Sequence, residues 1–330
     1  MAAGFEARTF TFADDYDGPV TATLVRRTHA TKQSCAVLYL HGYVDYFFQV
    51  DLADFFERTL AQTAGQGCDF FALDLRKHGR SLPEGYQYPN FALSLDEFFP
   101  EITEALEVLH GDGYTWVLLN GHSTGGLVAA RYLQDGPRKD WVSALFLNSP
   151  FLDFNELQIS PAAIAVTKFV AEACWHCYSG TAVSRWYARS LHQPAPECPD
   201  CNGRWTFDLR LKPIDGFRVY FAWVRAIARA QARAREGGIA QPVLILHSDH
   251  SDKGRSKLWK EEYRRADLVL DVEDITREGP RLGTQVTLRP IAGGVHDLVL
   301  SDDDARGRVF DEVTAWLRAL PTGPFAAAVK

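Results

Sequence analysis

Short apolar stretches alternate with amphipathic helical patterns along most of the chain, and this alternation constrains the fold more than any other feature. Strands that are apolar at every residue must be covered on both faces, which is typical of a parallel sheet between two layers of helices. The expected strands lie at residues 9–12, 20–25, 36–40, 70–73, 116–119, 144–147, 243–246 and 286–288. The helical patterns lie at residues 51–64, 95–109, 126–133, 217–235 and 304–317. The sequence therefore predicts an α/β fold whose first two strands form a hairpin.

One stretch, about residues 151–237, interrupts the alternation. It is rich in aromatic residues, cysteine and arginine, and it lacks alternating strands and helices. A chain of 330 residues suggests about two domains. The pattern instead favours one α/β core, residues 1–150 and 238–330, with an inserted cap at 151–237. One side of the helix expected at 217–235 carries the arginines Arg225, Arg229 and Arg233. We expect a solvated face there, and transient contact with a membrane surface is the alternative.

The overall composition excludes several classes of protein. Hydrophobic residues make up 46% and charged residues 23%, which are ordinary globular values. A net charge of −7 argues against a nucleic-acid partner. No apolar run approaches the roughly 20 residues of a transmembrane helix, and residues 1–12 do not have the pattern of a secretory signal. We therefore expect a cytoplasmic protein, and the sequence leaves its oligomeric state open.

Residues 121–126 read Gly-His-Ser-Thr-Gly-Gly and contain a G-x-S-x-G motif. The motif lies between an expected strand and an expected helix, which is the context of a nucleophile elbow. Flanking glycines allow the backbone to turn sharply, and a helix N-terminus behind the serine favours developing negative charge. Ser123 is therefore the predicted nucleophile. The alternative is an ordinary Gly-Ser turn between a strand and a helix.

A serine hydroxyl needs an adjacent base to become nucleophilic. Where the serine lies on such an elbow, an acid and then a histidine follow it along the chain. His296 lies in a glycine-rich segment after the last expected strand, so we predict that it is the base. The acid should follow the preceding strand. Asp249 and Asp252 come directly after that strand, and Asp267 comes later.

Acyl transfer also requires hydrogen-bond donors for the developing oxyanion. The backbone N–H of Thr124, directly after the predicted nucleophile, is one expected donor. The second should come from the loop after the strand that ends in His41-Gly42, which indicates the N–H of Tyr43. We expect His41 to brace this loop.

Four motifs, taken in order, resemble those of the α/β-hydrolase superfamily. They are Leu-His-Gly-Tyr at 40–43, Asp-Leu-Arg-Lys-His-Gly-Arg-Ser at 74–81, Gly-His-Ser-Thr-Gly-Gly at 121–126 and Gly-Gly-Val-His-Asp at 293–297. The branch that they resemble is the monoacylglycerol lipase and lysophospholipase group, also described as serine aminopeptidase-like hydrolases. The resemblance covers about residues 20–150 and 238–320. It implies a mostly parallel central sheet of about eight strands, with helices on both faces and a variable cap.

The resemblance also bears on the acid. In many relatives the strand leads through a short glycine loop into an Ala-Asp-x-apolar-apolar-Asp pattern, in which the first Asp is catalytic and the second caps a helix. Residues 266–271 match this pattern, which favours Asp267 as the acid and Asp271 as the cap. This chain has Ser248 where most relatives have glycine, and its connection to Asp267 is longer. Asp249 therefore stays as the alternative acid.

The six cysteines fall into two groups. Two C-x₂-C pairs lie in the predicted cap with twenty residues between the inner cysteines, which is the spacing of a zinc ribbon. Chance pairs or a redox-active pair are the alternatives, so a structural zinc stays open at Cys174, Cys177, Cys198 and Cys201. No cofactor is expected for catalysis. Cys35 and Cys68 precede or begin core strands and are expected to be plain hydrophobic residues.

These features predict a serine hydrolase that cleaves carboxylic esters through an acyl-enzyme. The resemblance implies a monoacylglycerol, a lysophospholipid or a smaller apolar ester as substrate. The acyl pocket is expected to be lined by cap residues such as Phe151, Phe154, Trp175, Trp186 and Trp223. The alternatives are an amide or peptide hydrolase of the same fold, and a catalytically silent α/β-hydrolase that only binds a ligand.

Overall fold

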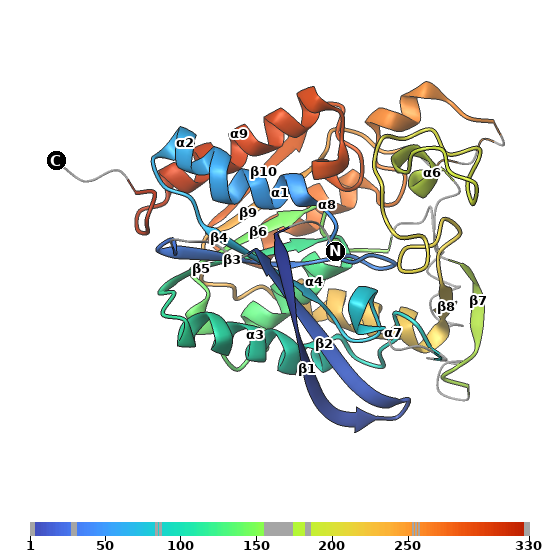
Figure 1. The fold of residues 1–330 in the computed structure, drawn as a ribbon, viewed down its shortest axis with the longest axis horizontal. Coiled ribbons are helices and arrows are strands. Elements are labelled where there is room, and N and C mark those ends of the chain that lie inside the picture. Colours follow the sequence, from blue (N-terminus) through green and yellow to red (C-terminus); the bar gives the residue numbers. More distant parts are fainter. Residues whose placement is uncertain are drawn as a thin grey trace.

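A mostly parallel sheet of eight strands forms the centre of the computed structural model (Figure 1). The structure describes residues 4–27, 32–82, 85, 88–154, 174–181, 186–252, 254, 256 and 258–326. In spatial order the strands are β1 (Phe5–Asp15), β2 (Gly18–Arg27), β4 (Asp69–Asp74), β3 (Cys35–Leu40), β5 (Trp116–His122), β6 (Ala144–Asn148), β9 (Val243–Ser248) and β10 (Val286–Ile291). The pairs β1–β2 and β2–β4 are antiparallel, and all other neighbouring pairs are parallel. The expected α/β class and the expected hairpin are confirmed.

Helices cover both faces of the sheet, as a parallel sheet requires. One face is covered by α1 (Val50–Asp54), a π-helical turn (Phe55–Thr59), α2 (Leu60–Ala64) and α9 (Asp303–Ala319). The other face is covered by α3 (Phe99–Gly111), α4 (Thr124–Asp135) and α7 (Phe221–Ala234) (Figure 1). Each layer contributes to its own buried apolar cluster against the sheet. No described helix is both long and apolar enough to span a membrane.

The predicted cap, residues 151–237, is described only in part, because 155–173 and 182–185 lie outside the described residues. The described part contains α6 (Tyr187–Leu191) and a small antiparallel sheet of β7 (Tyr178–Thr181) and β8 (Arg218–Tyr220). The apolar side of α7 belongs to the core cluster, in which this last helix of the stretch packs against α4. The remaining described helix is α8 (Val272–Glu278).

The prediction that Cys35 and Cys68 are plain hydrophobic residues is wrong, because the structure joins them in a disulfide. Parallel pairing of β3 with β4 places Ala36 opposite Asp69, so the residues before them are also side by side. Their Cα atoms are 4.8 Å apart, within the usual range for a disulfide. The bond therefore follows from the strand register, which the sequence pattern alone does not fix.

Candidate active site

The predicted nucleophile lies on a sharp turn between a strand and a helix. β5 ends directly before Ser123, and α4 begins at Thr124. Ser123 has φ 53° and ψ −118°, a backbone conformation that a residue with a side chain rarely adopts. A Cβ atom on Gly125 would collide with the carbonyl oxygens of Leu40 and His41, so this glycine is required by the close approach of α4 to the end of β3. The strand-turn-helix context expected for the motif is present.

Three buried side chains form a hydrogen-bonded chain at this turn. Nε2 of His296 is 2.9 Å from Oγ of Ser123, and Nδ1 of His296 is 2.8 Å from Oδ2 of Asp267. The other carboxylate oxygen of Asp267 accepts hydrogen bonds from the backbone N–H groups of Val269 and Leu270, both at 2.8 Å. These backbone donors hold the carboxylate in one orientation, facing the imidazole.

The other two candidate acids do not reach His296. The carboxylate of Asp249 is 40% exposed and accepts a hydrogen bond from the backbone N–H of Gly293. The carboxylate of Asp252 accepts from the backbone N–H of Gly254. Both carboxylates therefore stabilise local turns near the end of β9.

Asp267 reaches the site because the chain leaves the end of β9 and returns beside it. The backbone N–H of Asp267 donates to the carbonyl of His250, and the N–H of Asp252 donates to the carbonyl of Asp267, both at 3.0 Å. This short parallel contact closes the excursion between the two segments. The carboxylate thus lies next to the carboxyl end of β9 although it is distant from that strand in sequence.

The loop after β3 packs directly on the elbow. A Cβ atom on Gly42 would lie 3.1 Å from Cβ of Ser123, so the Tyr43 peptide lies beside the turn that carries the serine. Nε2 of His41 accepts a hydrogen bond from the backbone N–H of Leu75, which braces the loop as expected. The N–H of Val44 donates to the Asn90 side chain.

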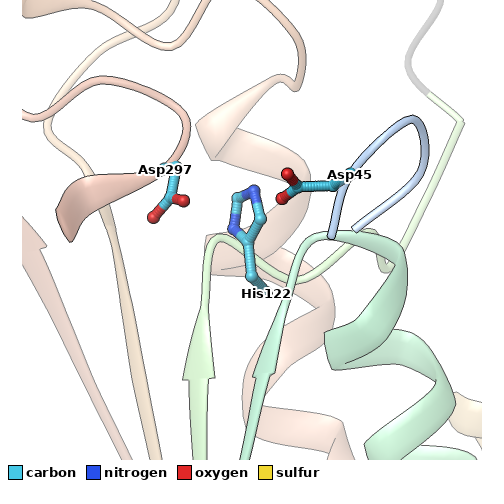
Figure 2. Close-up of side chains that lie close together, drawn as sticks. All are labelled: Asp45, His122 and Asp297. Atoms are coloured by element: carbon cyan, nitrogen blue, oxygen red, sulfur yellow. The ribbon is translucent and has the colours of Figure 1, made fainter. Parts of the chain in front are cut away.

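A second group of buried polar side chains lies next to the elbow. Figure 2 shows the imidazole of His122 between the carboxylates of Asp45 and Asp297. Potential donor atoms of these three residues lie within 4.8 Å of one another, a spacing that a metal ion would accept. However, Nζ of Lys212 is 2.7 Å from Oδ1 of Asp45, so an ammonium group already supplies a cation there.

Burial and neighbouring charges shift the pKa values of this group. Burial lowers the pKa of His122 and outweighs the opposite effect of the nearby carboxylates. For Asp297, burial opposes ionisation, but His122, Lys212 and the side-chain amides of Gln49 and Asn148 lower the pKa below its ordinary value. Asp297 is therefore held as a carboxylate within this buried group. In the sequence, only its position directly after His296 indicated that Asp297 could lie at the site. Nothing in the sequence indicated this for Lys212.

The aromatic residues expected to line an acyl pocket do not all lie together. The Tyr43 and Trp223 rings stack with centroids 5.4 Å apart, and the backbone N–H of Phe151 donates to the carbonyl of Ser123. The same apolar cluster contains Phe154 and Trp175. Trp186 instead lies in a separate cluster, where its ring contacts Trp259 and Tyr263. Aromatic residues of both the β3 loop and the predicted cap therefore lie next to the elbow.

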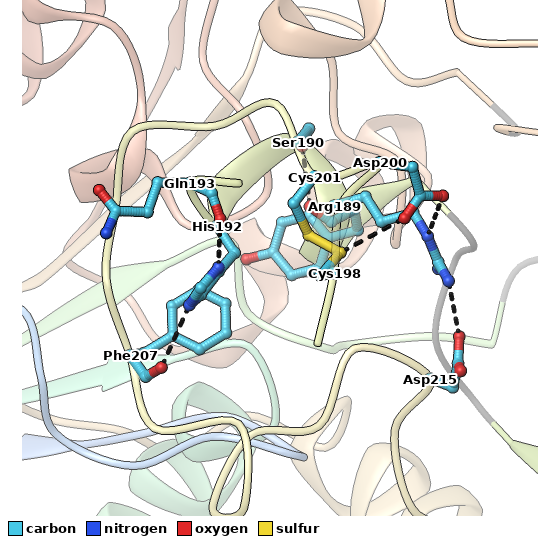
Figure 3. Close-up of a disulfide and its surroundings, with 10 residues drawn as sticks. Arg189, Ser190, His192, Gln193, Cys198, Asp200, Cys201, Phe207 and Asp215 are labelled. Carbon is cyan, nitrogen blue, oxygen red and sulfur yellow. Dashed lines mark hydrogen bonds and ion pairs between the residues drawn. A yellow bond between two sulfur atoms is a disulfide. The ribbon is translucent and has the colours of Figure 1, made fainter. Parts of the chain in front are cut away.

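Each C-x₂-C pair is closed by its own disulfide, Cys174–Cys177 and Cys198–Cys201. Figure 3 shows the second disulfide beside Arg189, which forms ion pairs with Asp200 and Asp215. A zinc site at these four cysteines would require them as reduced thiolates, so a structural zinc stays a prediction.

Comparisons with known proteins agree with this architecture. The model of the family "Serine aminopeptidase, S33" matches residues 31–268. A soluble variant of monoglyceride lipase from Saccharomyces cerevisiae, solved with a substrate analog, is similar in structure, with 15% identity, a TM-score of 0.63 and 93% coverage of both chains. Monoacylglycerol lipase from Paleococcus ferrophilus has 17% identity and a TM-score of 0.60, covering 94% of this chain and 98% of its own.

No curated protein is significantly similar to the chain in sequence. The solved structures are too distant in sequence to carry more than the fold, and that fold is the α/β-hydrolase fold. The family model covers well over half of the chain, including the elbow and Asp267. The chain belongs to the serine aminopeptidase S33 family of α/β-hydrolases.

Proposed function

We propose that the protein is a serine hydrolase that cleaves carboxylic esters with Ser123 as the nucleophile. The observation that carries this proposal is the pair of hydrogen bonds at His296: Nε2 lies 2.9 Å from the Ser123 hydroxyl and can accept its proton, and Nδ1 lies 2.8 Å from the Asp267 carboxylate. His296 takes the serine proton as Oγ attacks the acyl carbon, and Asp267 orients the imidazole and stabilises its charged form. His296 then protonates the leaving alcohol.

The backbone N–H groups of Tyr43 and Thr124 bind the oxyanion in this proposal. Support comes from the loop after β3, which packs against the elbow at Gly42, and from the start of α4 directly after Ser123. Donors that are fixed before the reaction stabilise the tetrahedral intermediate without reorganisation. Water activated by His296 finally releases the acyl group and regenerates the serine.

The proposed substrate is a monoacylglycerol, a lysophospholipid or a smaller apolar ester. The aromatic side chains of Tyr43, Phe151 and Trp223 at the elbow favour an apolar acyl group. Two of the solved structures similar in fold are named as monoglyceride lipases, which agrees with this choice. A series of p-nitrophenyl esters with acyl chains of two to sixteen carbons, followed by monoacylglycerols and lysophospholipids, would identify the preferred length.

Amide or peptide hydrolysis is the second candidate, because the family description names an aminopeptidase. Aminoacyl p-nitroanilides compared with p-nitrophenyl esters at equal concentration separate the two activities. A faster p-nitroanilide reaction would replace the ester proposal.

A fluorophosphonate probe tests the nucleophile, because it labels only an activated serine. We expect the wild-type protein to be labelled and Ser123→Ala to lose both labelling and ester turnover, with kcat falling by about 10⁴-fold or more. Ser190→Ala is the matched control, since Ser190 is also buried but its hydroxyl donates to the carbonyl of Tyr187. Absence of labelling in the wild type would favour the silent binding protein. Labelling that survives Ser123→Ala would exclude Ser123 as the nucleophile.

A further inference from the structure

We propose that Lys212 is a positioning residue: its ammonium group compensates the charge of Asp45 and so holds the loop that carries the Tyr43 amide against Ser123. This inference rests on the proposed function, in which that amide binds the oxyanion. Lys212 lies in the predicted cap and Asp45 in the loop after β3, 167 residues apart. The ion pair therefore joins the cap to the candidate oxyanion loop.

The ion pair is almost fully buried. Nζ of Lys212 is 2.7 Å from Oδ1 of Asp45, and their side chains are 6% and 1% exposed. The ammonium also lies 5.4 Å and 5.6 Å from the ring centroids of Phe48 and Phe207, within range of a cation–π contact. Buried charges are retained only where they are paired, so each of the two groups depends on the other.

The turn that carries Lys212 is itself attached to the same core loop. The backbone N–H of Lys212 donates to the carbonyl of Asp208, and the N–H of Asp208 donates to the hydroxyl of Tyr46. Tyr46 directly follows Asp45 in the chain. The cap thus contacts this loop through a backbone anchor and, one residue away, through the ion pair.

Asp45 needs a cation because of its surroundings. Its Oδ2 atom is buried and makes no hydrogen bond within the described residues. Its carboxylate points towards His122, with the carboxylate of Asp297 beyond the ring (Figure 2). Asp297 has amide donors of its own from Gln49 and Asn148. Lys212 is therefore the group that balances Asp45, and without it two carboxylates would share a buried site.

The loop between Tyr43 and Asp45 is strained and is held from both sides. Val44 has φ 50°, a left-handed conformation that is uncommon for a β-branched residue and that the surrounding structure must enforce. On one side of Val44, the Tyr43 hydroxyl donates to the carbonyl of Arg218. On the other side, Asp45 is fixed by Lys212. Removing Lys212 would leave Asp45 as an uncompensated buried carboxylate next to Val44, and its displacement would allow the Tyr43 amide to move.

The variant Lys212→Met tests this role, because methionine keeps the length of the side chain and removes its charge. We expect kcat for a p-nitrophenyl ester to fall about 10- to 100-fold, since a displaced oxyanion donor weakens the transition state. KM should stay within about threefold of the wild-type value and the pH profile of kcat should not move, because neither ground-state binding nor the base changes. The matched control is Lys260→Met, an exposed lysine paired with Glu262, which should behave as the wild type.

The double variant Asp45→Asn/Lys212→Met separates positioning from a general structural role. Removing both charges leaves no unpaired carboxylate, so kcat should recover to within about fivefold of the wild type. Should Lys212→Met fail to fold, Asp45→Asn alone serves, because it preserves the side-chain shape and should lower kcat about tenfold.

An unchanged kcat in Lys212→Met would overturn the inference, as would an unchanged kcat in Asp45→Asn where Lys212→Met does not fold. A raised KM with unchanged kcat would overturn it too, because Lys212 would then be a substrate-binding residue. The remaining contrary results are a shifted pH profile of kcat and a double variant whose kcat is no higher than that of Lys212→Met. A wild type that neither turns over esters nor reacts with the fluorophosphonate probe would remove the proposed function and this inference with it. An active wild type matched by Lys212→Met would remove the positioning role alone.

Discussion

At the scale of single residues, the identity of the acid decides how the base is oriented. Asp267→Asn keeps the shape of the side chain but lets the wrong imidazole tautomer form, so kcat should fall by about 10⁴-fold. Asp249→Asn is the matched control, because its carboxylate is partly exposed and contacts the Gly293 backbone instead of His296. We expect it to retain kcat within about twofold. Steady-state kinetics on one ester measure both, and a greater loss in Asp249→Asn would reassign the acid.

Asp297 should contribute to stability through its ionised form. Its pKa is lowered in the folded protein despite burial, so this contribution is complete above the unfolded pKa of about 3.9 and is lost as the pH falls through the folded value. Asp297→Asn should lower the free energy of unfolding at pH 7 by about 2 kcal/mol, because hydrogen bonds to a charged acceptor are weakened. The difference from the wild type should narrow between pH 5 and pH 3. Urea titrations at several pH values measure this, and a difference that widens in acid would contradict it.

The sequence could predict the site residues that belong to local motifs. Ser123 and His296 could be predicted because glycine-flanked turns after strands place them at the carboxyl edge of the sheet. Strand order alone left three aspartates as candidate acids, and only the family resemblance favoured Asp267, since its position depends on an excursion that returns by a backbone contact at His250. Lys212 could not be found, because nothing local marks a lysine in the predicted cap that pairs with a residue 167 positions away.

At the scale of elements, hydrophobic periodicity located the core strands and helices but misplaced some of their ends. The strand expected at 116–119 continues to His122, and the helix expected from 126 begins at Thr124. The residues between these two expected elements are glycines and polar residues without an apolar pattern. Hydrophobic periodicity therefore could not show that the strand and the helix both extend into the elbow. The helix expected at 51–64 contains the π-helical turn Phe55–Thr59, which the same apolar spacing cannot reveal.

The close approach of α4 to β3 makes a glycine at the elbow indispensable. In Gly125→Ala the added methyl group would overlap the carbonyl oxygens of Leu40 and His41, which are backbone atoms that cannot rotate away. We expect a loss of about 3 kcal/mol or more in the free energy of unfolding. Gly307→Ala in α9 is the matched control, since its Cβ would meet no atom within 4 Å and should stabilise the helix by about 0.5–1 kcal/mol. Equal effects of the two substitutions in a denaturant titration would refute the steric argument.

At the scale of the whole molecule, the core could be predicted from the sequence and the cap could not. Apolar strands have few arrangements, whereas the described part of the stretch at 151–237 owes its contacts to scattered aromatic residues, ion pairs and disulfides. All six cysteines lie in the described part of the chain and pair as three disulfides. Location in the cytoplasm stays a prediction. Since a reducing cytosol disfavours disulfides, thiol counting on protein alkylated at lysis tests it: three intact disulfides would argue against that location.

Several buried histidines couple the stability of the whole molecule to pH. Burial is the main cause of the lowered pKa values of His78, His122 and His247. Near and below pH 6.5 the unfolded chain binds protons at these histidines, whereas in the folded protein they stay neutral. The free energy of unfolding must therefore fall as the pH falls. Between pH 7.5 and 5.5 the expected loss is about 1 kcal/mol for each histidine that stays neutral.

Urea titrations at these two pH values measure the loss, and His247→Gln is the informative variant. Its imidazole Nδ1 donates to the Ser248 carbonyl, while Nε2 makes no hydrogen bond within the described residues, so an uncharged amide can replace the donor. The pH dependence of this variant should be shallower than that of the wild type by the contribution of one histidine, about 1 kcal/mol over the interval. If the wild type were equally stable at both pH values, the folded protein would bind these protons as readily as the unfolded chain. Burial would then not lower the pKa values of these histidines.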